Sequence, residues 1–285
     1  MTAAAEISGA LLRARPLPRP GNDGKEERGR LLVVAGSAEL PGAALLTAEA
    51  GLRAGAGKVM VAAPAESVAA LSLALPEARV TGLSAKPSAR QFEGRDAVVV
   101  GPGMAGKEAR RWADAALVRA GDAPLLLDAA ALERLWTSAR LRRRRQDGSD
   151  ERCIVTPHAG ELAGMAKLDQ EEIAREPERA AAQAAAHLGA IVVLKAGATT
   201  VVAADGMLFR QYARIPGLAT SGAGDVLAGL IGGLLARGTA PIDACLWGVF
   251  LHAEAGRRLG ARVGSIGYRA GELGAEIPKL MEAMR

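Results

Sequence analysis

The sequence predicts an α/β protein in which a mainly parallel sheet is covered by helices on both faces. Short, continuous apolar runs recur along the chain, for example at residues 31–35 and 97–100, and such runs are typical of parallel strands buried on both faces. Loops with glycine and helical segments separate the runs, which is the order of right-handed βαβ units. The 285 residues suffice for a single domain, and no solenoid-type repeat is visible.

The elements follow in order. Residues 1–30 are expected to form an extended N-terminal lead-in with a short helix within residues 7–14, and residues 31–285 form the domain. The first βαβ unit has a strand at residues 31–35, a helix opened by Pro41 and Gly42, and a strand at residues 58–62. Further strands are expected at residues 97–100, 125–128, 153–156 and 191–195, a hairpin turning at Asp205-Gly206, and helices at about residues 107–120, 178–188, 241–259 and 270–284.

One stretch, residues 217–238, combines a glycine-rich start with an apolar helix. Gly222 and Gly224 flank Ala223, and glycine permits backbone angles that let successive N–H groups face one small volume. Unpaired N–H groups and the positive dipole at a helix start make that volume an anion site. Asp225 follows directly, and a carboxylate beside a phosphate cradle suits a general base that takes a proton from a hydroxyl as phosphate arrives.

A simpler interpretation of G-A-G-D is a tight turn capped by aspartate, since Asp is common at helix starts. The rest of the helix favours the functional interpretation. It contains Gly229, Gly232 and Gly233, which lower its intrinsic stability, so we expect another group to approach its backbone closely. His187 and His252 lie in helical segments and are expected to be surface or packing residues.

Composition indicates a globular protein with a core of Ala, Val and Leu, because hydrophobic residues make up 49% of the chain and aromatic residues 3%. The net charge of +5 suits anionic small molecules as well as nucleic acid. The basic run at residues 140–152 lacks aromatic residues, which favours a solvated helix end and loop over a nucleic-acid site. Cys153 and Cys245 lack metal-ligand spacing. Without a secretory signal or a membrane-length apolar run, we expect a cytoplasmic protein.

Several motifs occur in order between residues 31 and 235, namely V-V-A-G-S, G-P-G-M, L-D-A-x-A-L, T-P-H-A-G-E-L, L-K-A-G-A-T and G-A-G-D-V-L-A-G. Together they resemble the ADP- or ATP-dependent NAD(P)H-hydrate dehydratases, a branch of the ribokinase-like superfamily. The resemblance implies a ribokinase-like fold and a metabolite-repair lyase. Such an enzyme returns the S form of NADH-hydrate or NADPH-hydrate to NADH or NADPH, while ADP or ATP gives AMP or ADP and phosphate. Many organisms fuse this domain to an epimerase, and the length of this chain leads us to expect the standalone form.

The resemblance also implies roles for residues. Asp225 is expected to activate the C6 hydroxyl for attack on the terminal phosphate, while the N–H groups of Gly222, Ala223 and Gly224 hold the charge that develops there. The phosphorylated intermediate then loses phosphate with help from the ring nitrogen. Contacts with the hydrated cofactor are implied for Ala43, Gly103, His158 and Asp225. Contacts with the nucleotide are implied for Lys195, Ala196, Gly197, Ala198, Thr199 and Gly224.

Other expectations come with the family. Mg²⁺ is expected with the nucleotide, held largely by phosphates and water, with Glu161 helping through water. The family also suggests a homotetramer, without nucleic-acid or membrane partners. The residues leave open whether ADP or ATP is the donor and whether NADH-hydrate or NADPH-hydrate is preferred.

Three motifs depart from the family pattern. Ala196-Gly197 stands where Gly-Ala is usual, Ala130 replaces a common aspartate and leaves Asp128 as the acid of that motif, and Ala223 replaces a usual Ser or Thr. The resulting G-A-G-D is the form found in sugar kinases.

Two alternatives therefore stay open. One is a kinase of the same fold that acts on a small alcohol or vitamin precursor. His158 argues against it, because vitamin kinases of this fold tend to have Asn there, although His158 also fits a loop residue bonded to backbone. The other alternative is a nucleotide-binding regulator without catalysis, which the intact Asp225 and its glycine cradle oppose.

Overall fold

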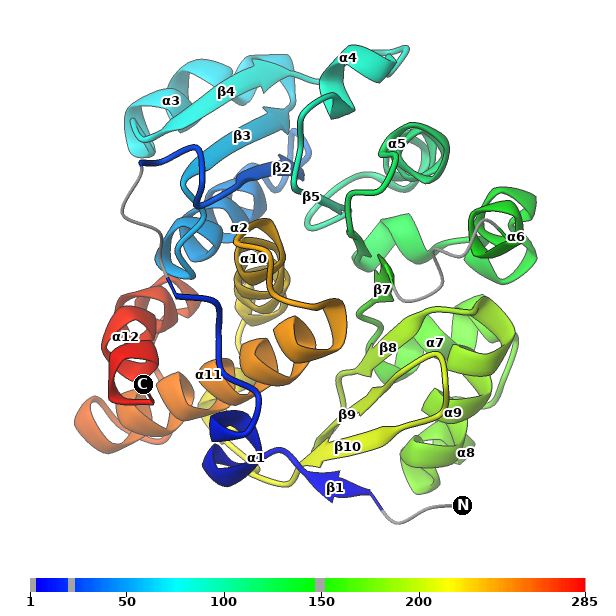
Figure 1. Cartoon of the computed structure of the whole chain (residues 1–285), viewed down its shortest axis with the longest axis vertical. Helices are drawn as coiled ribbons and strands as arrows, with labels where there is room; N and C mark the ends of the chain where they lie inside the picture. The colour runs from blue at the N-terminus through cyan, green and yellow to red at the C-terminus, as the bar shows by residue number, and fades with distance from the viewer. Residues whose placement is uncertain (1–3, 20–23, 147–151, 285) are drawn as a thin grey trace.

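The computed structural model describes residues 4–19, 24–146 and 152–284 (Figure 1). Its centre is a ten-stranded sheet in the order β1-β10-β9-β8-β7-β6-β5-β2-β3-β4. The strands are β1 (Ala5–Glu6), β2 (Arg30–Val34), β3 (Lys58–Ala63), β4 (Ala78–Gly82), β5 (Ala97–Val100), β6 (Leu125–Leu127), β7 (Cys153–Val155), β8 (Ile191–Leu194), β9 (Thr199–Val202) and β10 (Leu208–Gln211). Strand β9 is antiparallel to β8 and β10, and the other pairs are parallel. The predicted, mainly parallel sheet is confirmed.

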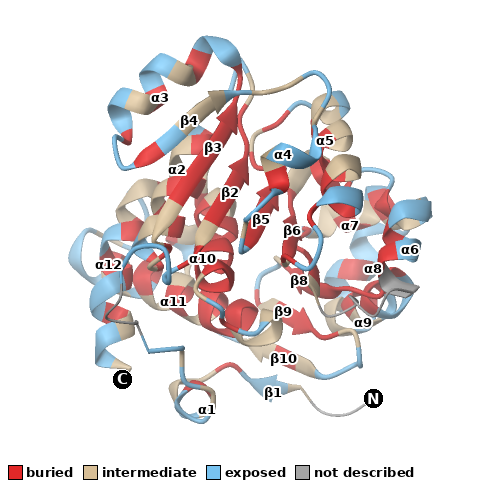
Figure 2. Ribbon diagram, turned by 45° about the horizontal axis from the view of Figure 1, so that its top comes forward, coloured by how far each residue is buried: buried red, intermediate tan, exposed pale blue. Residues whose placement is uncertain are grey.

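Helices cover both faces of this sheet. They are α1 (Gly9–Arg13), α2 (Gly42–Arg53), α3 (Val68–Ala74), α4 (Ala89–Phe92), α5 (Gly106–Arg119), α6 (Ala139–Gln146), α7 (Ala159–Ala166), α8 (Gln170–Arg175), α9 (Pro177–Leu188), α10 (Ala223–Ala236), α11 (Pro241–Arg262) and α12 (Ala270–Ala283). Because successive side chains of a strand point to opposite faces, Leu31 joins a core with α2, α10, α11 and α12, whereas Leu32 joins one with α5, α7, α8 and α9. Figure 2 shows the central strands buried between these layers, whereas β4 at one edge is only partly buried.

The segment between β3 and β5 escaped the sequence prediction. It forms α3, the edge strand β4 and the short α4. Strand β4 pairs on one side with β3, and just one of its five residues is buried, so it has no continuous apolar run to mark it. By contrast, the predicted hairpin is present as β9 and β10, and Met207 N donates to Asp205 Oδ1 at its turn.

The glycines of α10 meet α2. A Cβ on Gly229 would lie 2.2 Å from the carbonyl oxygen of Thr47, and a Cβ on Gly233 would lie 2.4 Å from that of Gly51. These glycines therefore let two helix backbones touch. The close approach predicted from the sequence is present, but its cause is helix packing rather than a ligand, so it no longer argues for function.

The residues before β2 are tied to the rest of the fold. Strand β1 pairs in parallel with β10 at one edge of the sheet, and the expected short helix is α1. Arg15 pairs with Asp243 of α11 at 2.6 Å, and the Trp247 ring nitrogen donates to the Arg15 carbonyl oxygen at 2.8 Å. The N-terminal segment thus bridges the sheet edge and α11.

The basic run at residues 140–152 is partly described. Arg140 of α6 pairs with Asp114 of α5 at 3.2 Å. Arg144 is buried and donates to the Ala123 carbonyl oxygen at 2.8 Å, and burial lowers the pKa of its guanidinium. The prediction of a solvated helix end is therefore wrong for Arg144, because α6 packs on α5 through that side. Residues 147–151 lie outside the described residues.

Candidate active site

The predicted site residues gather where neighbouring parallel strands end. Gly103 follows β5, His158 follows β7, Lys195 follows β8, and Asp225 lies in the first turn of α10. In open α/β sheets ligands bind at this edge, because the loops there leave room between them. The fold thus collects residues that are distant in sequence.

Asp225 is half-buried. Burial raises the pKa of Asp225, the charge of Asp128 raises it further and Lys195 partly lowers it, so that it lies at about 6. A general base is most effective when its pKa lies near the working pH. Asp225 therefore has the acidity that a base needs at neutral pH.

The backbone before Asp225 supplies hydrogen-bond donors. Gly222 is the N-cap of α10 with φ of 87°, a conformation that favours glycine. The N–H of Ala223 donates to the Thr220 carbonyl oxygen at 3.2 Å. Within the described part of the chain, no acceptor bonds to the N–H groups of Gly222 and Gly224. Two of the three predicted cradle donors are thus open, and that of Ala223 is engaged.

A histidine fixes the start of α10. Nε2 of His252, on α11, lies 2.9 Å from the Ala223 carbonyl oxygen, which makes Nε2 the protonated ring nitrogen. Burial lowers the pKa of His252 to about 4, so the ring is neutral in ordinary buffers. The expectation that His252 packs is met, and its hydrogen bond additionally anchors the first turn.

Beneath the cradle lies an ion pair. Lys195 Nζ is 2.7 Å from Oδ1 of Asp128, and Thr156 Oγ1 donates to the same oxygen at 2.6 Å. A Cβ on Gly224 would lie 3.4 Å from Lys195 Nζ, so the ammonium group sits against the backbone next to Asp225.

Ala43 and Gly103 pack directly against each other. A Cβ on Gly103 would lie 2.3 Å from the Ala43 Cβ and 3.2 Å from the Leu40 carbonyl oxygen. Gly103 also has φ of 64°, which is unfavourable for other residues. Small residues are therefore required at both positions, and they form one wall of the region between β5 and α2.

His158 is the N-cap of α7. Its Nδ1 accepts from the N–H groups of Gly160 and Glu161 at 3.0 and 3.2 Å, while Glu161 Oε2 accepts from the His158 N–H at 2.7 Å. The ring remains more than half exposed, and Nε2 lies 3.5 Å from Glu161 Oε1. The bond to backbone is thus present, and the exposed side chain remains accessible to a ligand.

The predicted nucleotide loop joins β8 to β9. Lys195 pairs with His158 in an isolated parallel bridge, and its N–H donates to the Pro157 carbonyl oxygen at 2.8 Å. Ala196 and Gly197 are exposed, and a Cβ on Gly197 would meet open space. After them Ala198 is buried and Thr199 begins β9. The tip of the loop is therefore free to receive a ligand.

The comparison with known proteins settles the family. A model described as NAD(P)H-hydrate dehydratase matches residues 31–279. The chain belongs to this family. It is 42% identical to an ADP-dependent (S)-NAD(P)H-hydrate dehydratase of Xanthomonas campestris, over 98% of this chain and 96% of that protein.

Two further members of the NAD(P)H-hydrate dehydratase family are informative. A bifunctional NAD(P)H-hydrate repair enzyme of Escherichia coli is 34% identical over 93% of this chain, which spans 50% of that protein. A crystal structure of the ADP/ATP-dependent NAD(P)H-hydrate dehydratase of Bacillus subtilis, co-crystallised with ATP/Mg²⁺, matches with a TM-score of 0.87 and 26% identity over 100% of both chains. The predicted ribokinase-like fold and the resemblance are both confirmed.

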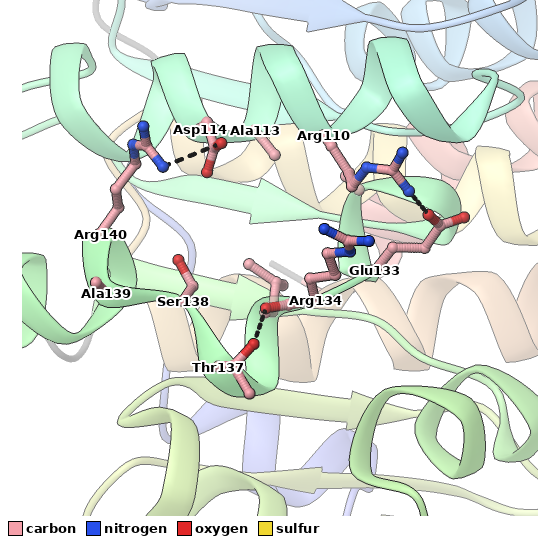
Figure 3. Close-up of a pocket in the computed structure, with 11 residues that line it drawn as sticks. Arg110, Ala113, Asp114, Glu133, Arg134, Thr137, Ser138, Ala139 and Arg140 are labelled. Carbon is pink, nitrogen blue, oxygen red and sulfur yellow. Dashed lines mark hydrogen bonds and ion pairs between the residues drawn. The ribbon is translucent and has the colours of Figure 1, made fainter.

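Figure 3 shows a cavity of about 320 Å³ that lies apart from these residues. Arg110 pairs with Glu133 at its rim, and Arg140 pairs with Asp114. No predicted site residue lines it. In contrast, a cavity of about 350 Å³ borders Thr220 and the rest of the loop that leads into α10. The second cavity borders the residues that precede the cradle, and neither the cradle residues nor Asp225 line it.

Sequence reasoning missed three members of this dehydratase-family site. The sequence marks Asp128 as the acid of its motif without a role, Thr156 as the end of a strand, and His252 as a surface or packing residue. Asp128 carried a usable signal, because it is an acid at the carboxyl end of a buried strand. Thr156 and His252 carried none, since their hydrogen bonds join elements distant in sequence.

Proposed function

We propose that this protein dehydrates the S form of NADH-hydrate or NADPH-hydrate, with ADP or ATP as phosphate donor. The observation that carries the proposal is the half-buried Asp225 carboxylate with a pKa of about 6, which lies beside open N–H groups at the positive end of α10. Family membership supports this substrate class.

In the proposed reaction Asp225 takes the proton from the C6 hydroxyl, and the freed oxygen attacks the terminal phosphorus of the nucleotide. AMP leaves when ADP is the donor, and ADP leaves when ATP is. The N–H groups of Gly222 and Gly224 bind the developing negative charge. The N–H of Ala223 joins them if it donates to phosphate in place of the Thr220 carbonyl oxygen. The C6–O bond then breaks with the ring-nitrogen lone pair, phosphate departs, and loss of a proton from C5 restores the double bond.

The proposed contacts divide between two sides of the cradle. The hydrated ring lies along the wall of Ala43 and Gly103, within reach of the exposed His158 ring. The nucleotide lies at Gly224 and the loop of Lys195, Ala196, Gly197, Ala198 and Thr199. The open space at Gly197 and the exposure of the loop tip support this division.

We also propose Mg²⁺ as a companion of the nucleotide. The described residues hold no group of three or more His, Cys, Asp or Glu suited to a metal ion. We therefore propose an ion that is bound largely by phosphates and water, with Glu161 reaching it through water. Such an ion supplies positive charge that offsets the charge of the phosphates.

The names of the relatives favour ADP as donor, so AMP and phosphate are the proposed co-products. We assign catalysis to residues 31–285 and propose a cytoplasmic homotetramer. Among the described residues, no helix is long and apolar enough to cross a membrane.

The decisive experiment incubates the protein with hydrated NADH and either ADP or ATP, and follows the returning absorbance of the reduced ring. AMP and phosphate formed in step with NADH support the proposal. Nucleotide consumption with a small alcohol such as a hydroxymethylpyrimidine, without any NADH, would establish the kinase alternative. Nucleotide binding without turnover under any of these conditions would establish the regulator.

A further inference from the structure

Lys195 points into the protein rather than toward the loop tip. Its Nζ lies against Gly224, 3.4 Å from where a Cβ would stand, and its side chain is 21% exposed. The loop atoms available to a nucleotide follow it in the sequence. The ammonium group is thus next to the backbone that precedes Asp225.

Asp128 holds this ammonium group in place. Its side chain is 3% exposed, and Oδ1 receives both Lys195 Nζ at 2.7 Å and Thr156 Oγ1 at 2.6 Å. The three side chains come from the ends of β6, β7 and β8. The following residue, Ala129, has φ of 48°, a conformation that costs free energy for alanine and is common at functional sites.

Stability alone does not account for such a pair. Desolvating two charges commonly cancels the gain from their attraction, so a buried ion pair is weak evidence for stabilisation. An apolar pair of similar volume would join the same strand ends at no such cost. A role for the charges themselves is the better explanation.

We propose that Asp128 and Lys195 are positioning residues for Asp225, forming a fixed dipole under the cradle that sets the charge state in which Asp225 meets the substrate. The proposal rests on the proposed function of Asp225 as a base. Lys195 favours the carboxylate form of Asp225, whereas Asp128 opposes it and keeps Lys195 from pairing with Asp225 directly.

Four charged or titratable groups near Asp225 have to be considered. Asp128 lies at the end of β6 and Lys195 at the end of β8, and both act on Asp225. Burial lowers the pKa of Lys195, but Asp128, Glu161 of α7 and Asp225 together raise it above its usual value. His252 of α11 stays neutral, because burial lowers its pKa to about 4. Asp128 and Lys195 are thus the charges with opposite effects on Asp225.

The experiment measures the titration of Asp225 by carbon NMR of the protein carrying labelled aspartate, with the signal assigned by its absence in Asp225→Asn. In the parent protein the midpoint is expected near 6. In Asp128→Asn it should fall to about 5 or below, because the repelling charge is lost and Lys195 is freed to approach. Adding Lys195→Met to that variant should move the midpoint back up. Thr156→Val, which removes a hydrogen bond from the same carboxylate without changing charge, is the matched control and should leave the midpoint in place.

Two results would overturn the inference. One is an unchanged midpoint in Asp128→Asn while the fold, read from the remaining signals, is intact. The other is an equal shift in Thr156→Val, which would reduce the pair to a structural support. The titration needs no turnover, so it separates this inference from the proposed function. A protein that turns over no hydrated cofactor yet shows these shifts would refute the activity and keep the dipole.

Discussion

Asp225→Asn should make this protein more stable at neutral pH. The pKa of Asp225 is about 6 in the fold against 3.8 for the free side chain, so folding disfavours its ionised form. Each pH unit of this difference corresponds to about 1.4 kcal/mol, which gives a penalty of at most about 3 kcal/mol. Because Asp225 is partly exposed, solvent screening reduces this to about 1–2 kcal/mol.

The sign of this effect defines its pH window. A carboxyl group with a raised pKa destabilises the fold fully above pH 6, and the penalty disappears as the pH falls from 6 toward 3.8. Asparagine keeps the size of Asp225 but carries no charge, and no capping bond is lost because the N-cap of α10 is Gly222. The variant should therefore exceed the parent in stability at pH 8 and match it at pH 4.

Denaturant unfolding and thermal unfolding of both proteins at pH 8 and pH 4 measure the difference. At pH 8 the variant should melt several degrees higher, since about 1 kcal/mol corresponds to roughly 2–4 °C in a protein of this size. Turnover should fall by roughly 10²-fold to 10⁴-fold, the range for loss of general-base assistance. A variant no more stable than the parent at pH 8 would show that Asp225 is not strained by its surroundings, and near-parent turnover would end its role as base.

Three further predictions concern the same site. Turnover at low substrate should fall about tenfold per pH unit below 6 as Asp225 becomes protonated, and a flat profile between pH 5 and 7 would contradict this. His252→Phe should lower turnover about tenfold, because the hydrogen bond to Ala223 is lost, but turnover should still fall with decreasing pH below about 6. If the variant no longer shows this fall, the titrating group is His252 instead of Asp225. In equilibrium titrations, Gly197→Val should weaken the binding of the nucleotide but not that of the hydrated cofactor. The control Gly260→Val, which also places a side chain in open space, should change neither affinity. Equal loss of both affinities in the Gly197 variant would mean that the loop is misassigned.

The sequence by itself determined the layered α/β architecture. The apolar runs at β2, β5 and β8 mark strands buried on both faces, since a strand that contacts helices above and below has no polar side. It also located the cradle, because G-A-G-D ahead of an apolar run describes a helix start through neighbouring residues alone. Such features depend on local spacing, which a sequence displays directly.

Elements without a local pattern needed the tertiary structure. Edge strand β4 has one buried residue in five, so no continuous apolar run announces it. Likewise, the glycines of α10 reported a close approach correctly, yet the sequence could not say whether a ligand or α2 makes it. In both cases the answer depends on which segment packs against the element, and only the fold determines that segment.

The tertiary structure also decided the electrostatics of the site. Asp128 and Lys195 are 67 positions apart, and they meet because β6 and β8 end at the same edge of the sheet, with β7 and Thr156 between them. His252 reaches Ala223 because α11 packs along α10. The pKa of Asp225 results from burial and from charges that are distant in sequence. The sequence therefore shows that a carboxyl group is present at this position, whereas its pKa depends on the three-dimensional arrangement.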